Sequence, residues 1–307
     1  MSIRNKIEKL FLWAGIFLRA DILNPLWRDR KRRRAARLNA YGDAMTKYSR
    51  KFLPAAAALP ACAAETNPFE KIYSMWLQGE DSAPQLVKSC FSSVRRHCSQ
   101  ELLVLDEKSL ANHIDLPGFI MDKRARGQIG HAHFADIARV ELLHNHGGFW
   151  TDASNFITQP IPQNIVDQDF FVYLANGEKG AIYSFMQNCF IRGKKNAYLL
   201  EAWRAMIHEY WKNEPKRLDY FIHQLLFKTL VTGDPRAKVA FAEMPHVCQD
   251  PTHILWSEEF RDKPFDQKEF DKVAAGAFFH KLGRRSYKKT ATGAPEPGTF
   301  ADVITKM

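Results

Sequence analysis

The chain has 307 residues, of which 46% are hydrophobic and 25% are charged, and its formal net charge is +10. This composition excludes a wholly disordered chain, a collagen-like chain and a membrane protein with many spans. Residues 1–52 contain fourteen Lys or Arg and four Asp or Glu, whereas the rest of the chain contains thirty of each sign. The excess charge therefore belongs to the N-terminal sixth, which argues against a nucleic-acid-binding protein and favours a neutral body with a basic arm.

The N-terminal arm alternates apolar clusters with basic residues. Its apolar run, residues 10–18, is far shorter than the roughly 20 residues that span a bilayer. Aromatic side chains and the basic run Arg28–Arg34 favour a helix that lies on an anionic membrane surface through residues 1–50. The alternative is a basic helix that packs on its own body. Residues 52–68 are rich in Ala and Pro, so we expect a boundary near residue 66.

Three short segments predict the start of a parallel sheet. Residues 71–77 are apolar and aromatic, residues 84–97 have helical periodicity after Pro84, and residues 101–106 are again apolar. Strand, helix and strand within some 35 residues form the βαβ unit of a parallel sheet.

A predicted helix over residues 131–146 precedes Gly147-Gly148 and a predicted strand that ends at Asp152. Ligands of open α/β sheets collect at the carboxyl ends of the strands, so a site is expected at Asp152. The remaining predictions are strands over 170–174, 188–191 and 277–280 and helices over 197–211 and 218–230. We predict an α/β fold, with a mixed sheet flanked by helices and an N-terminal basic helical arm.

Asp136 and Arg139 share one stripe of the predicted helix with Val140 and Leu143. Two charged groups beside core residues lose hydration unless they pair with each other or meet a polar ligand. A structural ion pair and a ligand site therefore both remain open at this point.

The segment from Ala132 to Ser154, A-H-F-A-D-I-A-R-V-E-L-L-H-N-H-G-G-F-W-T-D-A-S, resembles the signature of a glycosyltransferase superfamily. These are the GT-A enzymes of the DXD sugar-transferase or capsular polysaccharide synthesis type, related to glycosyltransferase family 32. Their pattern is S-D-x-x-R, a leucine-rich turn and G-G-x-[YW]-x-D-x-[DST], with the two aspartates sixteen positions apart, as Asp136 and Asp152 are here. The resemblance implies a GT-A-like, Rossmann-type domain over 66–285, between the arm and linker (1–65) and a tail (286–307).

The resemblance implies a divalent cation, Mn²⁺ or Mg²⁺, held by Asp152. Ser154 stands where the second acid of D-x-D would be, and a hydroxyl is a weaker ligand. His280, in a late H-K-L segment, is the candidate third ligand and would favour Mn²⁺. The alternative for His280 is a histidine at the end of a strand that is hydrogen-bonded to a backbone carbonyl.

Donor contacts are implied for five residues, namely Trp76, Gln78, Asp136, Arg139 and Lys281. Trp76 would lie against the nucleotide base with Gln78 beside it. Asp136 and Arg139 would bind hydroxyls and phosphate, and Lys281 would face a phosphate. Asp219, in a D-Y-F segment, would orient the acceptor or stabilise positive charge at the anomeric carbon, or it would cap a helix.

The resemblance implies a metal-dependent, retaining glycosyltransferase of cell-surface polysaccharide synthesis. Its partners would be a UDP-sugar or GDP-mannose donor and a saccharide or lipid-linked acceptor, with no nucleic acid. Five scattered cysteines without a C-x-x-C pair favour a reducing compartment, so we expect a cytoplasmic protein, peripheral on the inner face of the membrane. The alternative is a non-catalytic sugar-binding or scaffold protein with a degenerate D-x-D.

Overall fold

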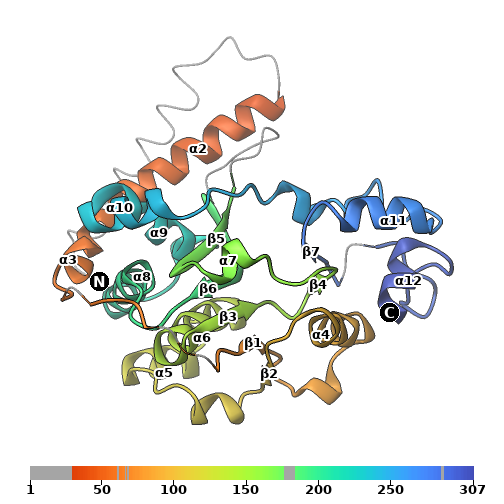
Figure 1. Cartoon of the computed structure of the whole chain (residues 1–307). Coiled ribbons are helices and arrows are strands. Elements are labelled where there is room, and N and C mark those ends of the chain that lie inside the picture. Colours follow the sequence, from red (N-terminus) through yellow and green to blue (C-terminus); the bar gives the residue numbers. More distant parts are fainter. Residues whose placement is uncertain (1–29, 61, 66, 68, 176–183, 285–286) are drawn as a thin grey trace.

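The centre of the protein is a mixed five-stranded sheet (Figure 1), seen in a computed structural model that describes residues 30–60, 62–65, 67, 69–175, 184–284 and 287–307. Its strand order is β2-β1-β3-β6-β5. β1 pairs in parallel with β2 and β3, while β6 runs antiparallel to both β3 and β5. The strands are β1 (Ile72–Met75), β2 (Leu102–Leu105), β3 (Gly148–Thr151), β5 (Phe170–Leu174) and β6 (Met186–Gly193). The predicted α/β fold, with a mixed sheet and parallel pairs, is confirmed.

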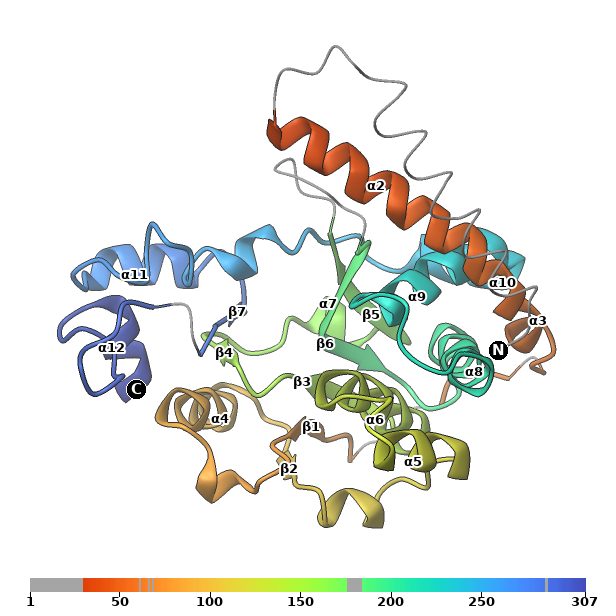
Figure 2. The same cartoon turned by 180° about the vertical axis from the view of Figure 1, so that it is seen from behind.

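Helices cover the sheet on both sides (Figures 1 and 2). α6 packs on β1, β3 and α8, α9 packs on β6, and α4 packs on β2. The α-helices are α2 (Arg30–Ser49), α3 (Leu53–Ala57), α4 (Gln85–His97), α5 (Gly118–Ala125), α6 (His131–His146), α7 (Gln163–Val166), α8 (Tyr198–Asn213), α9 (Ile222–Gly233), α10 (Pro235–Glu243), α11 (Gln267–Ala274) and α12 (Phe300–Lys306). Short 3₁₀ turns are η2 (Arg50–Phe52), η3 (Glu80–Ser82), η4 (Ser109–Asn112) and η5 (Asp250–His253).

A second, two-stranded sheet lies beside the end of β3. Its strands are β4 (Asn155–Ile157) and β7 (Phe279–Lys281), which pair antiparallel with Asn155 opposite Lys281. The backbone N–H of Leu282 donates to the carbonyl of Ser154 at 2.8 Å and extends this pairing. A segment near the C-terminus is therefore fixed next to Asp152.

The junction between α6 and β3 consists of two glycines with positive φ, 67° at Gly147 and 107° at Gly148. A Cβ atom on Gly148 would lie 2.4 Å from the backbone oxygen of Lys71, the residue before β1. Only glycine fits this close approach of two chain segments, and it lets the chain reverse from helix to strand without an intervening loop.

The described part of the N-terminal arm packs on the body. α2 contacts α9, and α3 contacts α8. Met45, Tyr48, Phe52 and Ala56 belong to the main hydrophobic core. The second half of α2 therefore packs on the protein's own body, as the alternative interpretation proposed. The apolar run 10–18 lies outside the described residues. The predicted membrane contact stays a prediction. Within the described segments, no helix combines the length and the apolar character needed to cross a membrane.

The last part of the chain forms a smaller hydrophobic cluster. α12 packs against α4. Phe300 and Ile304 of α12 are fully buried with Leu86 of α4, Phe156 of β4 and Leu255. This cluster includes Phe156 of β4 and Leu282, the residue after β7, and so packs against both strands of the small sheet near Asp152. The division at residues 66 and 285 stays a prediction.

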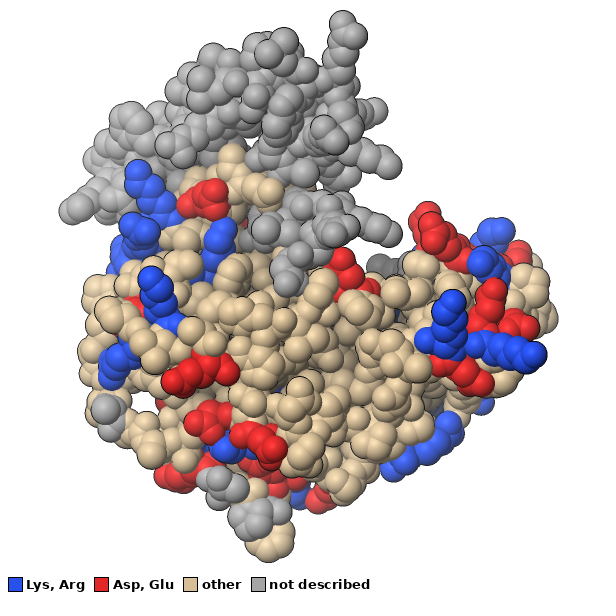
Figure 3. Space-filling model, turned by 45° about the horizontal axis from the view of Figure 1, so that its top comes forward, with Lys and Arg blue, Asp and Glu red and all other residues tan. Residues whose placement is uncertain are grey.

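Charged side chains on the face seen in Figure 3 gather along its left, lower and right edges, and its middle is mostly uncharged. Among the described residues, this face shows no broad area of one sign. Strong local charge on this face therefore comes from a few placed groups rather than from a broad charged surface.

Candidate active site

The geometry of α6 and β3 brings Asp136 and Asp152 to the same end of the sheet. From Asp136 to the end of α6 the helix rises about 15 Å. From Gly148 to Asp152 the extended chain runs back about 13 Å. Because Gly147 and Gly148 reverse the chain between them, a separation of sixteen residues in sequence becomes proximity in space.

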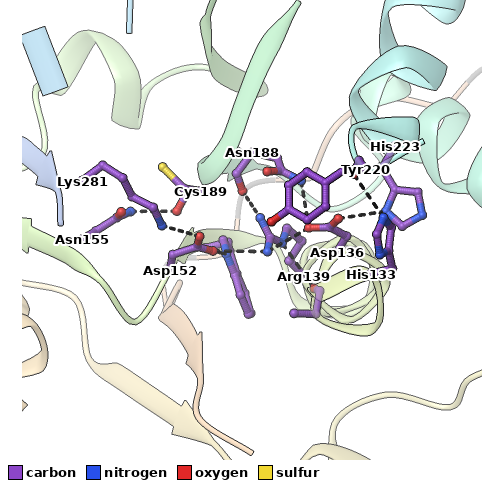
Figure 4. Close-up of polar contacts among 12 residues, drawn as sticks. His133, Asp136, Arg139, Asp152, Asn155, Asn188, Cys189, Tyr220, His223 and Lys281 are labelled. Carbon is purple, nitrogen blue, oxygen red and sulfur yellow. Dashed lines mark hydrogen bonds and ion pairs between the residues drawn. The ribbon is translucent and has the colours of Figure 1, made fainter. Parts of the chain in front are cut away.

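Four charged side chains form a continuous row in the site (Figure 4). Arg139 Nη2 lies 3.0 Å from Asp136 Oδ1 and 3.2 Å from Asp152 Oδ1. Lys281 Nζ lies 2.6 Å from Asp152 Oδ2, and Trp150 Nε1 donates to Asp152 Oδ1 at 2.9 Å. Arg139 is 5% exposed in its side chain, whereas Asp152 and Lys281 are 25% and 24% exposed. The row thus runs from the protein interior to the surface of a cleft.

Asp136 is held by neighbours from two other elements. Asn188 Nδ2 of β6 donates to its Oδ1 at 2.9 Å, and His223 Nδ1 of α9 lies 3.3 Å from its Oδ2. Trp211 Nε1 donates to His223 Nε2 at 2.8 Å, so in the neutral ring the proton is on Nδ1 and faces Asp136. Asn188 also accepts a hydrogen bond from Arg139 through its backbone oxygen. These contacts fix the orientation of Asp136.

The pKa values follow from this arrangement. Burial alone would raise the pKa of Asp136, but Arg139 and His223 outweigh it and lower the pKa to about 2. Burial also opposes the charged form of Asp152, yet Lys281 and Arg139 lower its pKa. Burial would lower the pKa of Lys281, but the carboxylate of Asp152 raises it. All three groups are therefore charged at neutral pH.

A cleft of about 1060 Å³ opens above the row and is lined by Trp76, Gln78, Ser154, Tyr220 and Arg284 among others. This volume is near the upper end of the roughly 300–1,000 Å³ of small-molecule sites. Among the described lining residues there are three Lys or Arg and two carboxylates. Arg284 lies over Trp76, with its Cζ atom 4.7 Å from the ring centroid. The cleft therefore offers an excess of positive charge and an aromatic surface in its lining.

The family model for capsular polysaccharide synthesis proteins matches residues 28–301, which is most of the chain. The chain belongs to this family. No curated protein matched it. Membership indicates a role in capsular polysaccharide synthesis.

In this capsular polysaccharide synthesis protein, the structure brings most of the predicted site residues together. Seven of them line the cleft: Trp76, Gln78, Asp136, Arg139, Asp152, Ser154 and Lys281. The sequence patterns assigned no role to Trp150, Asn188, His223 or Arg284. His223 follows the D-Y-F segment and Trp150 belongs to the G-G-x-W motif, so both motifs could have indicated these site residues. Nothing in the sequence around Asn188 pointed to a contact with Asp136.

Two predicted residues lie elsewhere. Asp219 is not among the cleft-lining residues. Its Oδ1 accepts the backbone N–H of Phe221, the residue before α9, at 2.7 Å. His280 is fully buried and does not line the cleft either. Lys281 of the same strand points at Asp152, and successive side chains of a strand point to opposite faces. Burial lowers the pKa of His280 to about 4.

The side chains around Asp152 do not form a ligand set for Mn²⁺ or Mg²⁺. Both Asp152 oxygens already contact cations, and Ser154 offers only a neutral hydroxyl. These ions prefer several oxygen ligands. In the described parts of this family member, no group of three His, Cys, Asp or Glu could hold a metal ion. The predicted cofactor stays a prediction.

Proposed function

We propose that this protein is a glycosyltransferase that transfers a sugar from a nucleotide-sugar donor to a saccharide or lipid-linked acceptor. The observation that carries the proposal is the ionised row of Asp136, Arg139, Asp152 and Lys281 in a cleft with excess positive charge. A nucleoside diphosphate sugar has the matching chemistry, because it joins an anionic diphosphate to a sugar rich in hydroxyl donors.

The cleft divides into regions that suit the parts of such a donor. The stacked pair of Trp76 and Arg284 suits the nucleotide base, and Gln78, which also lines the cleft, offers a hydrogen-bonding group. Arg139 and Lys281 suit the diphosphate. Asp136, fixed by Asn188 and His223, suits a sugar hydroxyl. Both UDP-sugars and GDP-mannose remain candidate donors.

We propose retention of anomeric configuration, and its support is that neither carboxylate of the cleft suits the general base of an inverting transfer. An inverting transfer needs a general base for the acceptor hydroxyl, and a good base has a pKa near the working pH. The two carboxylates in the described lining of the cleft are Asp136 and Asp152, whose pKa values are both lowered. They are therefore weak bases, and the imidazoles in the described lining are those of His131 and His253. In the proposed reaction the departing diphosphate accepts the acceptor proton.

The proposed place of action is the cytoplasmic face of the membrane, where a lipid-linked acceptor would be reached. The support is the basic sequence of residues 1–52, whose surplus of ten positive charges equals that of the whole chain. Anionic lipids attract such segments.

The proposal is tested with the purified full chain and a panel of UDP- and GDP-sugars, with and without saccharide acceptors. Donor cleavage is measured as release of nucleoside diphosphate, and product configuration by NMR. Asp152→Asn, which keeps the shape of the side chain, should lower turnover of the accepted donor by about 100-fold or more. Asp115→Asn, at an exposed aspartate outside the cleft, is the matched control.

The enzyme proposal fails if the wild-type protein cleaves no donor and nucleotide binding is the same in Asp152→Asn. That pair of results would favour the non-catalytic sugar-binding alternative. An inverted product would contradict retention alone.

A further inference from the structure

The two oxygens of Asp152 are each occupied by a cation. Oδ1 lies 3.2 Å from Arg139 and also accepts the indole N–H of Trp150, and Oδ2 lies 2.6 Å from Lys281. The row in Figure 4 therefore alternates in sign and sums to zero over Asp136, Arg139, Asp152 and Lys281. A divalent cation at Asp152 would lie beside two fixed positive charges, whose repulsion opposes its binding.

The backbone around Lys281 is held from both sides. Lys281 lies opposite Asn155 in the β4–β7 pair, and the next residue, Leu282, bonds to Ser154. Asn155 is itself tied to the end of β3, because its side chain donates to Thr151 Oγ1 at 3.0 Å and to the carbonyl of Cys189 at 2.8 Å. The backbone that carries Lys281 is therefore fixed relative to Asp152.

Lys281 retains the capacity to bind an anion. An ammonium group has three N–H donors, and the contact with Asp152 Oδ2 uses one of them. The side chain is 24% exposed and lines the cleft, so its remaining donors can reach a ligand there. A point charge on a flexible stem suits a phosphate oxygen.

We propose that Lys281, held by Asp152, takes the place of a divalent cation at the diphosphate of the donor, so that transfer by this chain needs no added metal. This inference rests on the proposed function. In the transfer step, the bond between the anomeric carbon and the diphosphate oxygen breaks, and its electron pair stays on that oxygen. Lys281 donates a hydrogen bond to the departing diphosphate. The acceptor oxygen bonds to the anomeric carbon, its proton passes to the diphosphate, and Lys281 keeps its own proton.

The test uses the full chain after treatment with EDTA and removal of the chelator, with residual metal measured by mass spectrometry. Turnover of the accepted donor and calorimetric binding of UDP and GDP are then recorded without metal and with Mn²⁺ or Mg²⁺. Lys281→Met removes the charge and keeps the stem length, Lys281→Arg keeps the charge, and Lys272→Met at the exposed end of α11 is the matched control. Thermal unfolding reports whether each variant folds.

We expect wild-type turnover to be the same with and without metal. Lys281→Met should lose about 100-fold or more in kcat. Lys281→Arg should recover part of this loss, and Lys272→Met should behave as wild type. Nucleoside diphosphate binding should weaken in Lys281→Met without any metal present. If Lys281→Met does not fold, the inference is still decided by the turnover of the wild type with and without metal and by the turnover of Lys281→Arg.

Turnover that disappears with EDTA and returns with Mn²⁺ would overturn the inference and leave the proposed glycosyltransferase standing. Absence of turnover with every donor, with or without metal, would instead count against the proposed function. In that case metal-free binding of UDP or GDP that Lys281→Met weakens would still support Lys281 as the diphosphate contact, and binding that requires Mn²⁺ would overturn it.

Discussion

Lys281 Nζ and Asp152 Oδ2 lie 2.6 Å apart although the two residues are separated by 129 positions in the chain. The contact depends on the pairing of β7 with β4, which begins three residues after Asp152. The site is therefore built from three regions: the α6–β3 unit, β6 with α9, and a strand close to the C-terminus. Loss of β7 would leave Asp152 with Arg139 as its remaining cationic partner among the described residues.

Asp136→Asn tests the buried end of the row. The carboxylate accepts from Asn188 and pairs with Arg139, so its loss leaves Arg139 partly unpaired in a buried position. We expect turnover to fall by about 100-fold. The free energy of unfolding at pH 7 should fall by roughly 2 kcal/mol, as the lowered pKa of about 2 implies. Urea unfolding measures the loss of stability, and donor cleavage measures the loss of turnover. Full turnover in a folded variant would contradict the role of Asp136 in the proposed reaction.

The same substitution predicts a pH dependence. The folded-state pKa of Asp136 is about 2, below its ordinary value of 3.8. Its contribution to stability is therefore complete above the ordinary value and is lost as the pH falls through the folded value. The difference in unfolding free energy between wild type and Asp136→Asn should shrink as the pH falls from about 4 to about 2. A difference that stays constant over this window would show that the ion pair is not its source.

Asp219→Ala separates the two roles considered for Asp219. Because Asp219 accepts the N–H of Phe221 and does not line the cleft, we expect a loss of about 1 kcal/mol in stability with unchanged kcat. Thermal unfolding and steady-state kinetics measure the two effects. A large fall in kcat at unchanged stability would favour the acceptor-orienting role instead.

Gly148→Ala should destabilise the fold. The added methyl would meet the Lys71 carbonyl at 2.4 Å, and φ at this residue is 107°. We expect a loss of more than about 2 kcal/mol in the free energy of unfolding. Gly118→Ala is the control, because a Cβ there meets nothing within 4 Å. Equal stability of the two variants would contradict the role of Gly148 in the close approach of the α6–β3 junction to Lys71.

Two deletions test the arm. Deleting residues 1–29 leaves α2 intact and should reduce sedimentation with anionic vesicles while thermal unfolding stays unchanged. Deleting residues 1–50 removes Met45 and Tyr48 from the main core and should cost about 4 kcal/mol or more of stability. Vesicles of neutral lipid are the control. Unchanged binding to anionic vesicles after the first deletion would refute the membrane contact of that segment.

Sequence patterns predicted the long and periodic elements well. α6 begins and ends at the predicted residues, because its apolar stripe is continuous and Gly147 ends it. β4 was not predicted, since it has three residues and begins with a polar one. His280 was chosen because the resemblance implied a metal-binding histidine in the late H-K-L segment. Which of two neighbours on a short strand faces a site depends on the register with its partner, and β7 alone does not reveal it. The contact of Asn188 with Asp136 likewise depends on the order of β3 and β6 in the sheet, which local pattern does not encode.

The two-glycine junction between α6 and β3 also limits how this protein can change. One residue inserted into α6 after Asp136 would turn Asp136 by about 100° around the helix axis. One residue inserted into β3 would move Asp152 to the opposite face of the sheet. With no loop between the elements to absorb either shift, the number of residues between the aspartates is as restrictive as their identity. Engineering of this site should therefore vary side chains and leave the length of the segment unchanged.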